Sequence, residues 1–179
     1  MKALPIPSDF RKIYKHWQTL QTVENQYSLK DWIGCISNCN VLIESMENDF
    51  FGYYYRGLCN IKLRFFEEAL SDLEKSKINL MKNKFPKLMK EYNQDVELRI
   101  ANLFRKERKY NLALKRIDLL LKEYPDYLNG YKEKAGIQTD MDNLQSALDS
   151  VNQGLLNSPK DQELLKFRKT LIYSLTTKQ

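Results

Sequence analysis

The sequence predicts an all-α fold in which helical hairpins repeat along a single domain of 179 residues. Only six glycines and five prolines are present, which is too little turn punctuation for many short strands. Apolar residues make up 42% of the chain and charged residues 29%, a balance typical of folded proteins and too apolar for intrinsic disorder. The third observation is a fixed spacing of small residues, which indicates an array of repeats.

The spacing appears in segments of one form, in which an aromatic residue or leucine is followed three residues later by a small residue and then by an apolar one. The small residues are Cys35, Ala69, Ala113 and Ala147, at intervals of 34, 44 and 34 residues. Pro125 and Pro159 are also 34 residues apart, and each lies twelve residues beyond one of these alanines. Residues 53–63 and 66–73 predict two helices joined by a short turn, so the repeating unit is a helical hairpin.

A 34-residue hairpin with a small residue in each helix and a closing proline resembles the tetratricopeptide repeat. The small-residue pairs are Gly57 with Ala69, Ala101 with Ala113, and Ala135 with Ala147. They are needed where paired helices approach to about 8–10 Å, because a large side chain there would separate the axes. The resemblance places an N-terminal arm at 1–15, repeats at about 16–49, 50–83, 94–127 and 128–161, an insertion at about 84–93, and a capping helix at 162–176.

The two ends and the insertion carry their own expectations. In the first repeat only the second helix, Leu29 to Ser45, is predicted, because Val23 stands where a small residue belongs. Ser8 and Asp9 can cap a helix that begins near Phe10. The ten extra residues between the second and third repeats predict lengthened helices there, with Pro86 in a first turn.

No catalytic residue, cofactor or metal is predicted, so the chain is not expected to be an enzyme. His16 is the only histidine, which excludes a two-histidine metal site, and the glycines form no phosphate-binding loop. Cys35, Cys39 and Cys59 are potential soft ligands, but Cys35 and Cys39 occupy core places of the repeat, where free cysteine behaves as a small hydrophobe.

The resemblance implies a right-handed superhelix whose first helices line a concave groove that binds a partner peptide or helix. By the register of the repeat, the partner-binding residues are Phe51, Tyr54, Leu58, Ile61, Lys62, Leu98, Asn102, Arg105, Lys106 and Lys132. This lining runs from aromatic to basic, which suits an amphipathic helix or extended peptide with an acidic part. Tyr54 and Leu58 are the expected anchor.

Three functions are open, and a scaffold or adaptor for one or more proteins, within a larger assembly, is favoured. The alternative is a co-chaperone that binds acidic chaperone tails. It is disfavoured because Tyr54 with Leu58, and Leu98 with Asn102, replace the family's Lys–Asn clamp. Nucleic-acid binding is the least favoured. Its support is the basic stretch from Lys75 to Lys122, with fourteen Lys or Arg against five Asp or Glu.

The expected location is cytoplasmic, with association to an organelle or the cytoskeleton left open. Pro5 and Pro7 interrupt the start of the chain where a secretory signal would be apolar, and no apolar run is long enough for a transmembrane helix. An odd and small number of cysteines, three, favours a reducing compartment.

Overall fold

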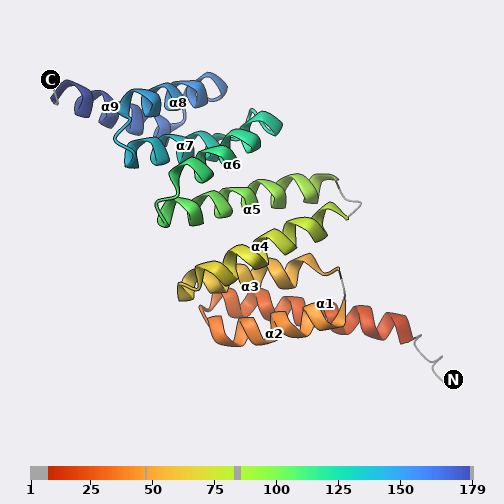
Figure 1. Cartoon of the computed structure of the whole chain (residues 1–179). Coiled ribbons are helices and arrows are strands. Elements are labelled where there is room, and N and C mark those ends of the chain that lie inside the picture. The colour runs from red at the N-terminus through yellow and green to blue at the C-terminus, as the bar shows by residue number, and fades with distance from the viewer. Residues whose placement is uncertain (1–7, 47, 83–85, 178–179) are drawn as a thin grey trace. The chain divides into compact units, whose positions relative to one another are not determined.

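The computed structural model describes residues 8–46, 48–82 and 86–177, and within these ranges the chain forms nine α-helices and no strand (Figure 1). The all-α prediction is therefore confirmed. Residues 1–7 of the predicted arm and 84–85 of the predicted insertion lie outside the described ranges. The helices are α1 (Ser8–Ser28), α2 (Trp32–Ser45), α3 (Phe50–Leu63), α4 (Phe66–Met81), α5 (Pro86–Lys106), α6 (Tyr110–Glu123), α7 (Leu128–Asp140), α8 (Leu144–Asn157) and α9 (Gln162–Thr177).

The helices divide into two compact units, with the boundary inside α5. Unit 1 holds α1 to α4 and the part of α5 that ends at Val96. Unit 2 begins at Glu97 and holds the rest of α5 with α6 to α9. Each unit is a series of antiparallel hairpins, in which an odd-numbered first helix is followed by an even-numbered second helix.

One turn geometry closes the first helix of every hairpin. The residue after or just beyond the helix has a left-handed backbone, and its successor donates a hydrogen bond back to the last turn, as in the Schellman motif. In the second hairpin Arg64 has φ 68°, and the Phe65 amide donates to the Asn60 carbonyl over 2.9 Å. The equivalent left-handed residues are Lys30, Arg64, Arg108 and Asp142. Their intervals repeat those of the small residues, so the turn belongs to the repeat.

The small residues lie where the helices of a hairpin approach each other. Cys35, Ala69, Ala113 and Ala147 are all fully buried. A Cβ atom added to Gly57 would lie 3.1 Å from Leu73 Cγ, so this contact between α3 and α4 leaves little room for a side chain. In the first hairpin Val23 takes the equivalent place and is fully buried, with its carbonyl 3.7 Å from Cys35 Sγ.

A polar pair twelve residues apart also recurs between the two helices of a hairpin. The pairs are Gln26 with Asn38 at 2.9 Å, Asn60 with Asp72 at 3.1 Å, and Gln138 with Ser150 at 2.7 Å. The third hairpin has Phe104 and Arg116 at these places. Because Gln26 aligns with Asn60 and Gln138, the pair fixes the register of α1, which the sequence leaves open.

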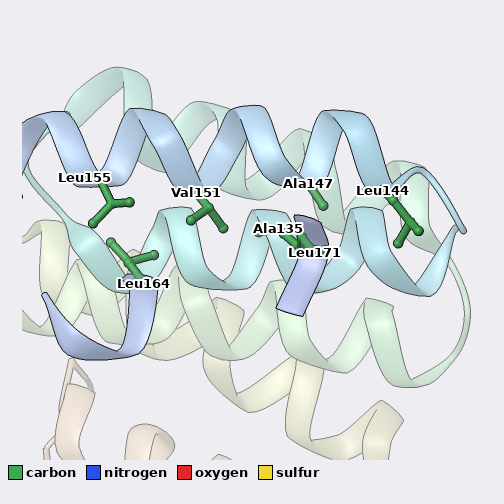
Figure 2. Packing of buried hydrophobic residues seen from close by; sticks show 7 residues of the cluster. All are labelled: Ala135, Leu144, Ala147, Val151, Leu155, Leu164 and Leu171. Atoms are coloured by element: carbon green, nitrogen blue, oxygen red, sulfur yellow. The ribbon is translucent and has the colours of Figure 1, made fainter. Parts of the chain in front are cut away.

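The ends of the hairpin series are formed by α5 in the middle and α9 at the close. α5 has 21 residues against 14 in α3, so the predicted lengthening of a helix is found at its start, which is Pro86. In unit 2, α9 covers the last hairpin through Leu164 and Leu171 (Figure 2). The other buried members of this cluster are Ala135, Leu144, Ala147, Val151 and Leu155.

Candidate protein-interaction surfaces

A chain of touching aromatic rings joins the first helices of unit 1. Tyr92 on α5 makes edge contacts with Phe50, Phe51 and Tyr54 of α3, with ring centroids 5.1–5.5 Å apart. Tyr55 extends the series from α3 to Tyr27 on α1, at 5.7 Å. Burial raises the pKa of both Tyr55 and Tyr92, so the rings stay neutral. The aromatic run of α3 therefore serves contacts between helices.

Two of the predicted partner-binding residues lie inside this contact. Tyr54 is 7% exposed and Leu58 is 3% exposed. The Tyr54 hydroxyl donates to Asp95 Oδ2 over 2.7 Å, which ties α3 to α5. Repeat register alone cannot show this, because the same face of α3 serves both as groove lining and as contact surface for the next first helix. Of the other residues predicted on α3, Phe51 and Ile61 are half-buried and Lys62 is exposed.

The predicted basic lining of unit 2 is occupied by ion pairs. Arg105 on α5 reaches Asp140 at 2.6 Å and Glu133 at 3.2 Å, both on α7. The hydrogen bond from Arg105 lowers the pKa of Asp140. Lys132 on α7 pairs with Asp161 at 3.3 Å and with Glu163 on α9. These cations stabilise contacts between successive first helices, and their charge is largely neutralised within the unit.

The remaining predicted residues of unit 2 are Leu98, Asn102 and Lys106. Leu98 is half-buried against the cluster around Ala101 and Ile117. The Asn102 side chain donates to the Leu98 carbonyl over 3.1 Å, so its amide is used within α5. Lys106, in the last turn of α5, is exposed.

The basic stretch is also paired with carboxylates outside the predicted groove. Arg116 lies 3.4 Å from Glu97, and Lys134 lies 2.8 Å from Asp118. Lys109 is bonded to Glu107 at 3.1 Å. A run of cations that each hold a carboxylate is a weaker polyanion surface than the sequence suggests.

A buried polar network in unit 1 explains where the first helix departs from the family pattern. Arg56 binds Asp72 through two nitrogens, at 2.9 and 2.7 Å, and this bonding raises the pKa of the guanidinium. Arg56 also reaches Asn40 on α2 at 2.6 Å, and Asn60 donates to Asp72. Residues that looked like losses of the family's Leu and Tyr thus join three helices.

Ser45, His16 and Asp49 lie in a row that resembles a catalytic triad but has the wrong proton arrangement. The Ser45 hydroxyl donates to the Leu42 carbonyl over 2.8 Å, so His16 Nδ1, at 2.8 Å, must donate to the serine oxygen. His16 Nε2 lies 3.2 Å from Asp49, whose pKa is raised by burial. A histidine that donates to the serine cannot act as its base. The row instead fastens α1 to the end of α2 and the start of α3.

The three cysteines sit in the core of unit 1, as their places in the repeat predict. Each is fully buried, beside Val23 and Leu42. Hydrogen bonding to the Cys35 sulfur, with burial, raises the pKa of Cys39 and Cys59, which keeps these two as thiols. Within the described ranges no group of three or more His, Cys, Asp or Glu side chains is arranged to hold a metal ion.

One exposed surface was missed by the sequence analysis. Ile13, Tyr14 and Trp17 on α1 are each more than half exposed, and together they form what we call the α1 patch. Their spacing of one and four residues places them on one side of the helix, a signal that was available in the sequence once α1 had a register. No helix in the described part of the chain has the length and apolar character needed to cross a membrane.

No protein-family model matches the chain, and no curated protein matches its sequence. Solved structures do match. A chain of the APC/C hetero-tetramer Cut9–Hcn1 aligns at TM-score 0.72 and 13% identity over 87% of this chain and 30% of its own length. MamA from residue 41 to its end, from Desulfovibrio magneticus RS-1, aligns at TM-score 0.68 and 13% identity, over 91% of this chain and 92% of that one.

An ArsTM double mutant of MamA RS-1 aligns at TM-score 0.69 and 12% identity, over 88% of this chain and 83% of that one. Identities this low establish the fold and nothing finer. Together with the 34-residue hairpins, their small-residue contacts and their common turn, the likeness shows that the fold of this chain is that of tetratricopeptide-repeat proteins.

Proposed function

We propose that this chain is a non-catalytic scaffold that binds one or more protein partners through its first helices, as a subunit of a larger assembly. One observation carries the proposal: the hairpins share their turns and small-residue contacts, whereas the first-helix surfaces differ from hairpin to hairpin. A constant framework with a variable surface is how helical repeats present binding sites. The Ser45–His16–Asp49 row, which lacks a base for the serine, supports the non-catalytic reading.

The structure-matched proteins are consistent with this proposal, since one of them is a chain of a hetero-tetramer. The location proposed with it is the cytoplasm, because three buried thiols suit a reducing compartment. The co-chaperone alternative gains nothing from the first helices, since Asn102 is bonded within its own helix. Nucleic-acid binding loses support because Arg105, Arg116 and Lys132 pair with carboxylates.

The test uses charge reversal at exposed lysines, because Tyr54 and Leu58 are buried and a charge there would unfold unit 1. Lys62→Glu in unit 1 and Lys106→Glu in unit 2 change the first helices, and Lys115→Glu on α6 is the matched control. Each tagged chain is used for affinity capture from the native source, followed by mass spectrometry.

We expect a stoichiometric partner that is lost or reduced at least about tenfold with one first-helix variant and retained with the control. The absence of any stoichiometric partner would count against the scaffold. A partner that is lost only with Lys115→Glu would move the binding surface to the second helices.

A further inference from the structure

The start of α1 projects beyond the helix with which it pairs. Ser45, the last residue of α2, bonds to His16, so the eight residues from Ser8 to Lys15 extend past α2. At 1.5 Å per residue this overhang is about 12 Å long. In Figure 1 α1 continues past the end of α2 toward the N-terminus.

The overhang carries most of the α1 patch. Ile13 is 56% exposed and Tyr14 is 60% exposed, while Trp17, one residue past the overhang's base, is 53% exposed. Scattered exposed apolar residues are ordinary, but three large ones on one side of a helix make a contiguous surface. An aromatic residue such as Trp or Tyr in a partly open site is also the residue type that anchors protein interfaces.

A hollow of about 460 Å³ lies beside the overhang. Lys12 and His16 of α1 form one wall, and Met46, Asn48, Phe50 and Phe51 form the other walls. Pockets of this size are lined by apolar groups with a few polar ones and can receive a ligand side chain. A flat lipid surface would leave such a hollow empty, so the shape favours a partner that projects side chains.

The charge of this region selects an acidic partner. Lys12 and Lys15 are exposed, and neither forms an ion pair with another described residue. The carboxylate nearest to the hollow is Asp49, which is already bonded to His16 and to the Gly52 amide. A partner with carboxylates beside its apolar residues would therefore meet complementary charge at the edge of the contact.

We propose that the α1 patch and the adjoining hollow bind an acidic amphipathic helix of a partner protein. One apolar side chain of that helix enters the hollow between Lys12 and Phe51, others cover Ile13 and Trp17, and its carboxylates face Lys12 and Lys15. Helix-on-helix packing is the expected mode, because α1 presents ridges of side chains four residues apart. This assignment rests on the proposed scaffold function and names the partner chemistry for one surface.

The experiment selects helical peptides of random sequence, displayed on phage, against the full chain. We expect the selected peptides to carry Asp or Glu beside apolar residues spaced three and four apart. Their binding should weaken at least about tenfold with Ile13→Asp and with the double change Lys12→Glu and Lys15→Glu. Ile172→Asp on α9, a second exposed apolar position, is the matched control and should leave binding unchanged. Trp17 fluorescence should shift to the blue as each peptide binds.

Other results would overturn the inference. Selected peptides without acidic residues, or peptides that bind Ile13→Asp as well as the unmodified chain, would remove the proposed partner. Phosphatidylcholine–phosphatidylserine vesicles that sediment with the chain, and lose it with Ile13→Asp, would reassign the patch to membranes. A dimer in sedimentation velocity that Ile13→Asp dissociates would reassign it to self-association. Native partner capture that depends on Lys62 or Lys106 would still uphold the scaffold in each case.

Discussion

The first helices of the two units are held together by different chemistry. In unit 1 aromatic rings make the contact, with Tyr92 of α5 against Phe50, Phe51 and Tyr54 of α3. In unit 2 ion pairs make it, with Arg105 bonded to Asp140 of α7. The comparison shows that one repeat framework tolerates apolar and charged contacts at the same level of the hairpin. It also leaves lysines without carboxylate partners in unit 1, at Lys12 and Lys15, among the described residues.

The largest difference between the units should come from removing a buried charge partner. Asp72→Ala in unit 1 leaves Arg56 and Asn60 without their shared acceptor, and we expect a loss of about 3 kcal/mol in the free energy of unfolding. Asp118→Ala in unit 2 breaks a pair whose carboxylate is 55% exposed, and should cost less than about 1 kcal/mol. Urea denaturation of both variants measures this contrast, and equal losses would break it.

The aromatic contact of unit 1 should rank second. Tyr92→Ala removes the ring that touches three others, and we expect a loss of about 2 kcal/mol because the site is only half-buried. Near-UV circular dichroism should lose intensity in the same variant. Tyr173→Ala, at a position 69% exposed on α9, should stay within about 0.5 kcal/mol of the unmodified chain. A similar loss in both variants would show that the ring contacts are incidental.

The ion pairs of unit 2 should give a smaller effect that depends on pH. Because the hydrogen bond from Arg105 lowers the pKa of Asp140, the pair stabilises the fold fully above the ordinary carboxyl pKa. This stabilisation is lost as the pH falls through the lowered value in the folded chain. Arg105→Gln should therefore cost less than about 1 kcal/mol at pH 6 and almost nothing at pH 2.5. Urea titrations at both pH values measure it, and a cost independent of pH would contradict the pairing.

The smallest effect should be common to both units, because they share the left-handed turn. Arg64→Gly and Arg108→Gly should each stabilise the chain by about 0.5 kcal/mol, since glycine adopts positive φ without a Cβ clash. Asp142→Gly should gain less, because aspartate tolerates this conformation better than arginine. Midpoints of urea unfolding measure the three changes. Destabilisation by Arg64→Gly would mean that its side chain is needed elsewhere.

Helix positions could be predicted because the repeat imposes them. The interval of 34 residues between Ala113 and Ala147 reports a helix contact that no large side chain satisfies. The left-handed turns could not be predicted, because Lys30, Arg64 and Arg108 are not the glycines that mark such turns. The tertiary environment of the hairpin overrides their local preference.

The candidate surfaces were harder to predict than the fold. Register places Tyr54 and Arg105 on the first helices, but it cannot distinguish a side chain that faces solvent from one that binds the next helix. Tyr54 found Asp95, and Arg105 found Asp140, through partners 41 and 35 residues away in the chain. The α1 patch was overlooked because the first helix lacked a register until the Gln26–Asn38 bond supplied one.

The placement of the cysteines and tryptophans makes unit 1 a spectroscopic and chemical reporter of its own opening. Cys35, Cys39 and Cys59 are fully buried, and together with Trp17 and Trp32 they all precede Val96. The sequence has three cysteines and two tryptophans in total, so unit 2 has neither residue type. Pulsed alkylation therefore times the exposure of unit 1 alone, while far-UV circular dichroism follows the helices of both units. A delay between the two signals would measure directly whether the halves of this chain melt as one cooperative body or in succession.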